Sequence, residues 1–334
     1  MKNAGIVGYG AIGPVHADAI DNVEYAELYA VCDTNADRAK LCTDKYGCIS
    51  YCDFDEMLKD HNIDVVHICT PHYLHKDMTI SALAAGKDVV LEKPVAMNRA
   101  EFRELMDYVE SNGKEKNLCI MLQNRTNACV VKMMDILRND ETAGKLEGII
   151  ANLAWHRDEI YYDQDEWRGN WKYEGGGLLI NQAVHLLDLM TYFGGDIDNV
   201  KSNISHWYVK NIEVEDNANA LIRFKSGING IFSATNCHST NAPFYLELQF
   251  EHMTLRYADG VVYKICGDDI DIIERDNKAH IGKAYWGNGH QRVIDAYYRS
   301  LHGEDAGFTG IQDSSNAMHL VYAMYEKGLK EELN

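Results

Sequence analysis

The sequence has 334 residues, of which 46% are hydrophobic and 25% charged, and its formal net charge is −19 at pH 7. This length allows two domains, and the acidic balance argues against nucleic acid or a membrane surface as the main partner, because phosphate groups are bound by an excess of Lys and Arg. The nine cysteines include no CxxC pair, and no apolar run approaches the ~18 residues that cross a bilayer, so we expect reduced thiols, no metal site and no membrane segment.

Strand and helix patterns alternate through the first third of the chain. Apolar runs predict strands at 4–8, 26–33, 64–70, 88–91 and 118–122, and amphipathic segments predict helices at 12–22, 36–46, 74–85 and 99–111. Helices of this length between strands are typical of βαβ units in a parallel sheet. We therefore expect an α/β fold whose first domain, residues 1–123, is a doubly wound Rossmann sheet. Because the first strand begins at the N-terminus, we expect no signal peptide and a cytoplasmic location.

The pattern changes after residue 123. A helix is predicted at 128–138, a long strand at 145–156, an aromatic and charged loop at 159–174, a helix from 178, and final helices at 290–302 and 312–329. Short alternating segments between 200 and 265 predict a mostly antiparallel sheet. The second domain is placed at residues 124–334, and no repeat or flexible linker precedes it.

The segment GYGAIG matches G-x-G-x-x-G between a strand and a helix. Gly8 permits the tight turn, Gly10 lets the backbone approach a pyrophosphate and Gly13 allows close helix packing, while the helix N-terminus offers N–H groups to phosphates. Asp33 ends the second strand, where a carboxylate would bind the adenosine ribose hydroxyls. We expect the dinucleotide to contact Gly8, Tyr9, Gly10, Ala11, Ile12, Gly13 and Asp33. NAD is expected over NADP because Asp33 would repel a 2′-phosphate, and helical spacing is expected to turn Arg38 away.

Two further strand ends reach the same carboxyl edge of the predicted sheet, where such folds bind ligands. CTPHYLH follows the strand at 64–70, and VVLEKPVA carries a Lys–Pro pair that favours extended backbone at the lysine. We expect the cofactor to be bordered by Thr70, Pro71, His75, Glu92 and Lys93, with Lys93 near the nicotinamide. The alternative for His72 and His75 is that they are surface polar residues at a helix start.

Behind three glycines, the sequence GGGLLINQAVHLLD places polar residues at helical spacing. Asn181, His185 and Asp188 stand at i, i+4 and i+7 and are therefore predicted on one helix face. Oxidation of a hydroxyl needs a group that takes the O–H proton, and histidine has a suitable pKa. Lys93 would supply positive charge where the alkoxide develops. The alternative for His185 is a hydrogen-bonded core histidine.

The order of GYGAIG, Asp33, CTP-x-x-x-H, EKP, WRG and GGG-x-x-x-NQ-x-x-H-x-x-D resembles the glucose–fructose oxidoreductase, inositol dehydrogenase and rhizopine catabolism family (Gfo/Idh/MocA) over essentially the whole chain. This resemblance implies a Rossmann domain that carries NAD or NADP. It also implies a C-terminal α/β domain on an open sheet, which closes over a sugar or polyol and often forms the oligomer interface.

The resemblance assigns roles to individual residues. Lys93 and His185 resemble the family's catalytic lysine and histidine, and Trp167 and Arg168 match a pair near the nicotinamide. We expect Asn181 to complete the catalytic group, and we expect substrate contacts from Lys93, Gln123, Tyr162, Asn181, Gln182 and His185. The resemblance also implies a cis peptide at Lys93–Pro94. Inositol-dehydrogenase-like members have Asp at the place of Asn181, and an amide cannot act as acid or base. The NQ version resembles members that act on nucleotide-linked or glycosidic sugars, including oxidation at C3.

The expected function is NAD-dependent hydride transfer at a secondary hydroxyl or ketone of a sugar, polyol or glycoside. One alternative retains NAD and cleaves a glycoside by oxidation and elimination; another is a non-enzymatic dinucleotide sensor, which would have no need of Lys93. Further substrate contacts are expected from 159–174 and 285–290, where aromatic faces suit a pyranose. The carboxylates of Asp158, Glu159, Asp163, Asp165 and Glu166 are expected either to repel a carboxylate substrate or to form a solvated surface. A homodimer or homotetramer through the C-terminal sheet is expected.

Overall fold

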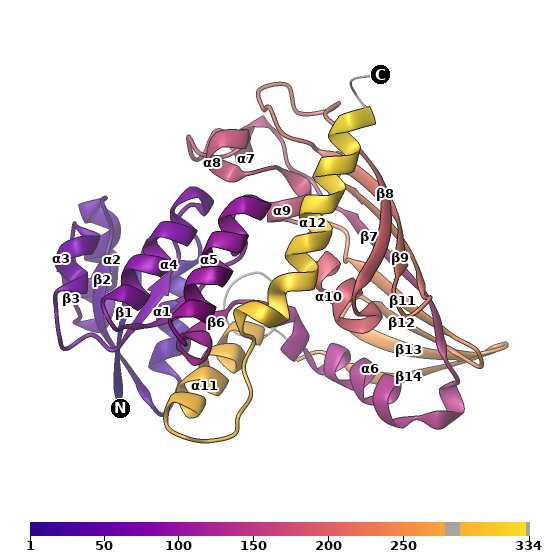
Figure 1. Ribbon diagram of the computed structural model, residues 1–334, viewed down its shortest axis with the longest axis horizontal. Helices are drawn as coiled ribbons and strands as arrows, with labels where there is room; N and C mark the ends of the chain where they lie inside the picture. The colour runs from indigo at the N-terminus through magenta and orange to yellow at the C-terminus, as the bar shows by residue number, and fades with distance from the viewer. Residues whose placement is uncertain (278–287, 332–334) are drawn as a thin grey trace. The chain divides into compact units, whose positions relative to one another are not determined.

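A computed structural model describes residues 1–277 and 288–331 of the chain (Figure 1). Residue contacts divide the chain into two compact units, residues 1–123 with 279–314 and residues 124–278 with 315–334. The structure differs from the expected division in one segment, because 279–314 belongs to the first unit. Its described part contains α11 (Gly289–Leu301), which packs against α1 (Gly13–Asp21).

The first unit is built on a six-stranded parallel sheet in the order β3-β2-β1-β4-β5-β6. The strands are β1 (Lys2–Val7), β2 (Ala26–Cys32), β3 (Ile49–Tyr51), β4 (Val65–Ile68), β5 (Asp88–Leu91) and β6 (Leu118–Ile120). The strand order reverses between β1 and β4, which is the point where sheets of this kind bind ligands at their carboxyl ends. The expected Rossmann sheet is therefore confirmed.

Helices pack around this sheet (Figure 1). Besides α1 and α11 they are α2 (Ala36–Tyr46), α3 (Phe54–Leu58), α4 (His75–Ala84) and α5 (Arg99–Ser111). The sequence expectation included neither β3 nor α3. The strand β3 shows no apolar run, because it is a short edge strand with two of its three residues exposed. The residues of the central strands β4 and β5 are buried. Burying each of their Val, Ile or Leu side chains stabilises the folded state by about 1.5–3 kcal/mol relative to leaving it exposed to water.

The second unit is built on an eight-stranded sheet in the order β14-β13-β12-β11-β7-β10-β9-β8. The strands are β7 (Leu146–Ala154), β8 (Ile197–Ser205), β9 (Asn217–Phe224), β10 (Asn229–Thr235), β11 (Tyr245–Phe250), β12 (Thr254–Ala258), β13 (Val261–Cys266) and β14 (Asp269–Arg275). Every pair is antiparallel except β7 with β10. The α/β class with a mostly antiparallel second sheet is thus confirmed, although β14 extends it beyond the expected segments.

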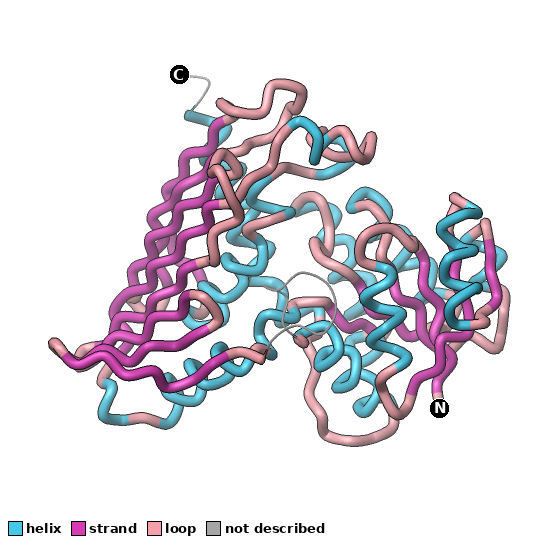
Figure 2. Tube along the Cα trace, turned by 180° about the vertical axis from the view of Figure 1, so that it is seen from behind, coloured by secondary structure: helices cyan, strands magenta, loops and turns pink. Residues whose placement is uncertain are grey.

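Helices of the second unit lie on one face of its sheet (Figures 1 and 2). They are α6 (Ala128–Asn139), α7 (Glu159–Tyr162), α8 (Trp171–Glu174), α9 (Leu178–Asn181), α10 (Val184–Gly194) and α12 (Ile311–Glu331), the first residues of which count with the first unit. Buried and exposed residues alternate along β9, as expected for a sheet with one covered face.

The single helix predicted from residue 178 is wrong, because the chain forms α9 and α10 with a break at Gln182 and Ala183. The backbone N–H groups of both residues donate to the carbonyl of Leu178, at 3.0 and 2.8 Å. This double use of one carbonyl interrupts the regular helical ladder and restarts the helix at Val184.

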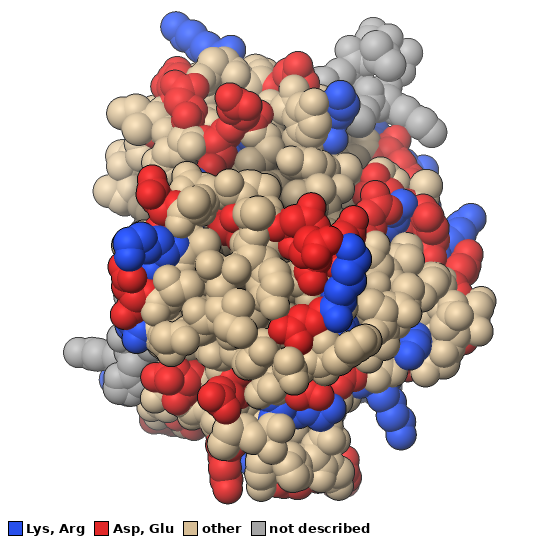
Figure 3. Space-filling view, turned by 90° about the vertical axis from the view of Figure 1, so that its left-hand side faces the viewer, with Lys and Arg blue, Asp and Glu red and all other residues tan. Residues whose placement is uncertain are grey.

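Within the described residues, no helix combines the length and apolar character needed to cross a membrane. On the face shown in Figure 3, Lys and Arg side chains appear at separate positions among Asp and Glu, in line with the acidic net charge.

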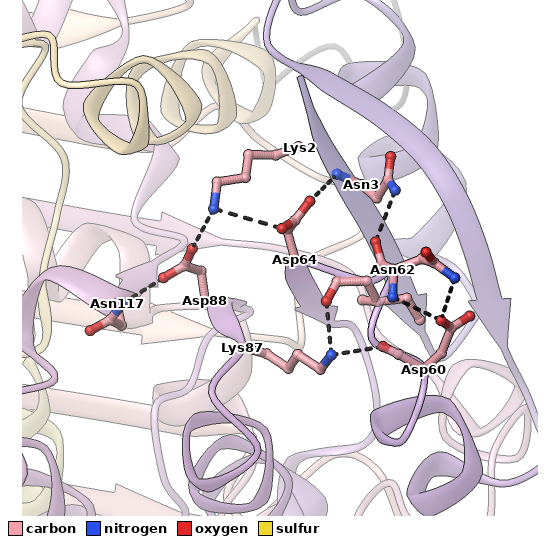
Figure 4. A network of polar contacts seen from close by, with 9 residues as sticks. Lys2, Asn3, Asp60, Asn62, Asp64, Lys87, Asp88 and Asn117 are labelled. Atoms are coloured by element: carbon pink, nitrogen blue, oxygen red, sulfur yellow. Dashed lines mark hydrogen bonds and ion pairs between the residues drawn. The ribbon is translucent and has the colours of Figure 1, made fainter.

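Charged side chains fill the amino end of the parallel sheet (Figure 4). The Lys2 ammonium lies 3.8 Å from Asp64 and 3.6 Å from Asp88, which are adjacent to β4 and at the start of β5. The Lys87 ammonium donates to the carbonyls of Asp60 (2.7 Å) and Ile63 (2.9 Å), and burial lowers its pKa. The residues with candidate chemistry stand at the opposite, carboxyl ends of these strands.

Candidate functional site

The glycine loop connects β1 to α1 and needs glycine at two positions for reasons internal to the protein. Gly8 has φ +88°, and a Cβ there would lie 2.7 Å from the Cys69 carbonyl oxygen; a Cβ on Gly13 would lie 2.5 Å from the Gly8 oxygen. At Gly10 the nearest atom would be 3.8 Å away, so the protein leaves this space open. The first turn of α1 has neither an acidic residue nor a side-chain cap. These features fit a dinucleotide whose phosphates approach Gly10 and the helix N-terminus.

Asp33 is held beside this loop at the end of β2. One carboxylate oxygen accepts the backbone N–H of Tyr9 at 2.7 Å and the other accepts that of Asn35 at 2.8 Å. Each oxygen keeps a further lone-pair position for a ribose hydroxyl.

The expectation that Arg38 turns away is wrong, because the atom nearest to a Gly10 Cβ is Nη1 of Arg38. The side chain of Asn35 caps α2 by accepting the N–H groups of Asp37 and Arg38. This cap starts the helix so that its first turn faces the glycine loop. The Arg38 guanidinium therefore lies near the part of the loop where the phosphates are expected, and the Asp33 carboxylate lies beside Tyr9 of the same loop.

His75 joins the ends of β4 and β5. Its Nδ1 lies 2.7 Å from the Pro94 carbonyl and its Nε2 lies 2.9 Å from the Thr70 carbonyl. His72 and His75 are both buried, so the surface alternative is wrong. The expected cis peptide at Lys93–Pro94 is confirmed. Burial lowers the pKa of His75, and a neutral ring has a single N–H, so the imidazole donates to one of these two carbonyls and packs against the other.

Glu92 lies in a buried polar network that the sequence did not reveal. Its Oε1 is 3.0 Å from His16 Nε2 and 3.5 Å from His290 Nε2, and its Oε2 accepts the Lys93 backbone N–H at 3.1 Å. Burial by itself would raise the pKa of Glu92, but the hydrogen bonds from the two histidines hold it well below its ordinary value. An ionised carboxylate therefore fixes the backbone of Lys93.

The network continues from His16 to His67, whose Nδ1 atoms are 2.9 Å apart, and from His67 Nε2 to the Tyr298 hydroxyl at 2.9 Å. Burial lowers the pKa of both histidines, which favours neutral rings. One proton arrangement satisfies every bond: Tyr298 donates to His67, His67 to His16, and His16 to Glu92. The ligand atoms of His16, Glu92 and His290 lie within 4.8 Å of one another, and hydrogen bonding already accounts for this closeness.

In the second unit, partly buried hydrogen bonds hold Asn181 and Gln182. Asn181 Nδ2 donates to Glu174 at 2.6 Å, and Gln182 Nε2 donates to the Tyr161 hydroxyl at 3.1 Å. Asn236 Nδ2 lies 3.2 Å from both Gln182 Oε1 and the Tyr162 hydroxyl. The structure thus brings together three expected substrate residues: Tyr162, Asn181 and Gln182.

The uninterrupted helix on which the shared face of Asn181, His185 and Asp188 was predicted does not form: Asn181 ends α9, whereas His185 and Asp188 both belong to α10. His185 stands in the first turn of α10, after the helix break, and is partly exposed. Asp188 is fully buried in a bidentate ion pair with Arg125, with N–O distances of 2.6 and 2.9 Å. Asp188 is therefore structural. Gln123 is a buried residue of the first unit, beside Gly289.

Trp167 and Arg168 follow α7. The Arg168 guanidinium lies 4.6 Å from the Trp167 ring centre and 4.7 Å from that of Tyr161, and its Nε donates to Asp165 at 3.0 Å. Of the other expected substrate segment, residues 285–287 lie outside the described residues, and His290 contacts Glu92.

The glycine run before α9 is fitted against buried side chains. A Cβ on Gly176 would lie 2.0 Å from the Tyr325 hydroxyl, and one on Gly177 would lie 2.4 Å from the Glu215 carbonyl oxygen. The Glu215 carboxylate accepts hydrogen bonds from Gly177 N (3.0 Å), Leu179 N (2.8 Å) and the Tyr325 hydroxyl (2.9 Å). Close packing explains these glycines.

Glu215 should make the stability of the protein depend on pH. Burial raises its pKa from 4.5 to about 7, against hydrogen bonds that lower it. The raised pKa means that protonated Glu215 stabilises the folded state. This contribution to the unfolding free energy is complete below the pKa of Glu215 in the unfolded chain and is lost as the pH rises through about 7, a change of ~3 kcal/mol. We expect the unfolding free energy of the wild type minus that of Glu215→Gln to fall by about this amount between pH ~4.5 and ~7.5, measured by urea denaturation.

The exposed neighbour Glu213 supplies the control, since Glu213→Gln should leave the slope unchanged. A difference between wild type and Glu215→Gln that is constant with pH would contradict the assignment.

Comparisons with known proteins agree with this geometry. The profile of the oxidoreductase family with an NAD-binding Rossmann fold matches residues 2–117, and that of the Gfo/Idh/MocA C-terminal domain matches residues 131–256. The chain is 25% identical to myo-inositol 2-dehydrogenase of Thermotoga maritima and 27% identical to D-glucoside 3-dehydrogenase of Escherichia coli, in both cases over 98% of this chain and 96% of the relative. It also resembles the structure of the WlbA dehydrogenase from Bordetella pertussis in complex with NADH and UDP-GlcNAcA, with a TM-score of 0.84 and 25% identity over 99% of this chain and 97% of that one.

Proposed function

The chain belongs to the Gfo/Idh/MocA oxidoreductase family, and we propose that it transfers hydride between NAD and a secondary hydroxyl or ketone of a sugar, polyol or glycoside. One observation carries the proposal. Within the first unit, the glycine loop after β1 and Lys93 after β5 stand at the carboxyl ends of one parallel sheet, with β4 between these strands. A dinucleotide on the loop and a cation at the same edge suit oxidation of an alcohol.

Bound NAD would supply the hydride acceptor. We assign to Lys93 the stabilisation of charge on the substrate oxygen, with its backbone fixed by Glu92. His185 takes or returns the hydroxyl proton. Asn181 cannot exchange a proton, so its part is to orient the substrate, with its amide held by Glu174.

A screen of sugars, polyols and glycosides with NAD, followed by NADH absorbance, tests the proposal. We expect pyranose-sized compounds to react faster than lactate or malate, because the loop at 159–174 carries partly exposed aromatic residues, Tyr161 and Trp167 among them, whose faces would suit sugar C–H groups. Faster turnover of lactate or malate would refute it. Cleavage of a glycoside without net NADH would instead support the oxidation–elimination alternative, and NAD binding without any turnover would support a sensor.

For assembly, we propose a homo-oligomer formed through the exposed face of the second sheet. Leu221 of β9 is 60% exposed and pairs directly with Ile231 of β10, which is 50% exposed; adjacent exposed apolar side chains are typical of protein interfaces. Light scattering should show a dimer or tetramer, and the double variant Leu221→Lys, Ile231→Lys should lower the measured mass.

We also propose a cytoplasmic location. All nine cysteines are free thiols, which supports a reducing compartment.

A further inference from the structure

Arg157, which follows β7, is a buried guanidinium without a carboxylate partner. It is only 6% exposed, and its Nη1 donates to the His156 carbonyl at 2.6 Å and to Asn241 Oδ1 at 2.8 Å. Its Nε is buried with no acceptor, and no Asp or Glu of the described chain forms an ion pair with it. Buried charges are ordinarily paired, because removing them from water is costly.

Aromatic rings offset part of this cost. The guanidinium lies 5.0 Å from the Trp155 ring centre and 4.9 Å from that of Tyr161, within the range of cation–π attraction. The Tyr161 hydroxyl accepts a hydrogen bond from Gln182, one of the residues assigned to the substrate. Arg157 is therefore one side chain removed from the proposed substrate group, inside the same unit.

The acidic residues of the neighbouring loop do not neutralise Arg157. Asp158 accepts the backbone N–H of Tyr161 at 3.0 Å, Asp163 accepts from Asn211 at 2.6 Å, and Asp165 pairs with Arg168. These three carboxylates have other partners, and Glu159 and Glu166 of the same loop are exposed to solvent. Beside Tyr161, Arg168 is paired with Asp165, whereas for Arg157 the described residues supply no carboxylate partner.

We propose that Arg157 binds an anionic group of the substrate, so that the sugar carries a carboxylate or a phosphate. This inference rests on the proposed sugar oxidoreductase function and names its substrate class. A guanidinium fork matches the paired oxygens of either group, and an anion there would supply the acceptor that Nε lacks.

Three substrates of matched size separate the possibilities: methyl glucoside, which is neutral, methyl glucuronide, which adds a carboxylate, and glucose 1-phosphate. With NAD, we expect the wild type to prefer one of the two anions. Arg157→Gln should raise KM for that anion by about 10- to 100-fold, the usual loss for a charged hydrogen bond, with little change for methyl glucoside. The anionic sugar whose KM rises in Arg157→Gln shows whether Arg157 binds a carboxylate or a phosphate. Arg223→Gln, at an exposed arginine of β9, should change nothing.

Equal losses on neutral and anionic sugars, or a wild-type preference for methyl glucoside, would show that Arg157 only braces His156 and Asn241 and would overturn the inference. If Arg157→Gln does not fold, Arg157→Lys decides, since it keeps the charge but loses the fork and should still lose selectively on the anion.

If no sugar is oxidised, the proposed function fails, and calorimetry with methyl glucuronide and glucose 1-phosphate tests Arg157 separately. Binding of either anion that is lost in Arg157→Gln and kept in Arg223→Gln would support the anion site. No binding of either would overturn it.

Discussion

Lys93→Met should lower kcat/KM by about 10²–10³, the loss typical of one preorganised donor to a developing oxyanion. The ammonium stands at the end of the fully buried strand β5, and its backbone N–H is held by the ionised Glu92. Methionine keeps the length of the side chain and removes the charge. The measurement is steady-state NADH formation on the best substrate of the screen. Lys40→Met, at an exposed lysine of α2, is the control and should retain full activity.

His185→Ala should cost a further ~10²–10⁴ through lost acid–base catalysis. If Lys93 and His185 serve one proton-transfer process, the double variant should lose far less than the product of the single losses. NAD affinity, measured by calorimetry, should change little in all three variants, because the glycine loop and Asp33 are unaltered. If Lys93→Met kept wild-type turnover, this lysine would have no part in catalysis, and the proposed mechanism would be wrong.

NAD should bind about tenfold to a thousandfold more tightly than NADP. A 2′-phosphate near Asp33 would meet a repulsion of about 4 kcal/mol at ~4 Å for an effective dielectric of ~20, reduced by screening. We expect Arg38 to moderate this preference, because its Nη1 lies 3.8 Å from the position of a Cβ on Gly10. Equal affinities for the two cofactors would refute the assignment.

Removing the charge of Asp33 should then expose the contribution of Arg38. In Asp33→Asn the amide oxygen can still accept one of the two loop N–H groups, so we expect the preference to shift toward NADP with the loop retained. Adding Arg38→Ala should abolish that gain. Calorimetric titration of each variant with both cofactors is the measurement, and a gain in NADP affinity that survives Arg38→Ala would exclude a role for this arginine.

Local chemistry determined the parts of this protein that the sequence predicted well. Helix α5 has the predicted bounds because Asn98 accepts the backbone N–H of Glu101, and the Glu101 carboxylate accepts the backbone N–H of Met97. This reciprocal capping involves only residues close together in the sequence. The glycine loop and Asp33 were recognisable for the same reason: each stands next to a strand whose apolar run is legible in the sequence. The family resemblance supplied Lys93 and His185 as an ordered set of such local motifs.

Contacts between distant segments decided the rest. Glu92 meets His16 across 76 positions and His67 meets Tyr298 across 231, and no periodicity encodes such pairs. The helix expected through His185 breaks where Gln182 and Ala183 share one carbonyl. Whether a charge is solvated, paired or buried depends on what the fold brings beside it. For this reason the sequence identified a carboxylate-rich loop, whereas only the tertiary structure placed the Arg157 guanidinium between two aromatic rings with its charge unpaired.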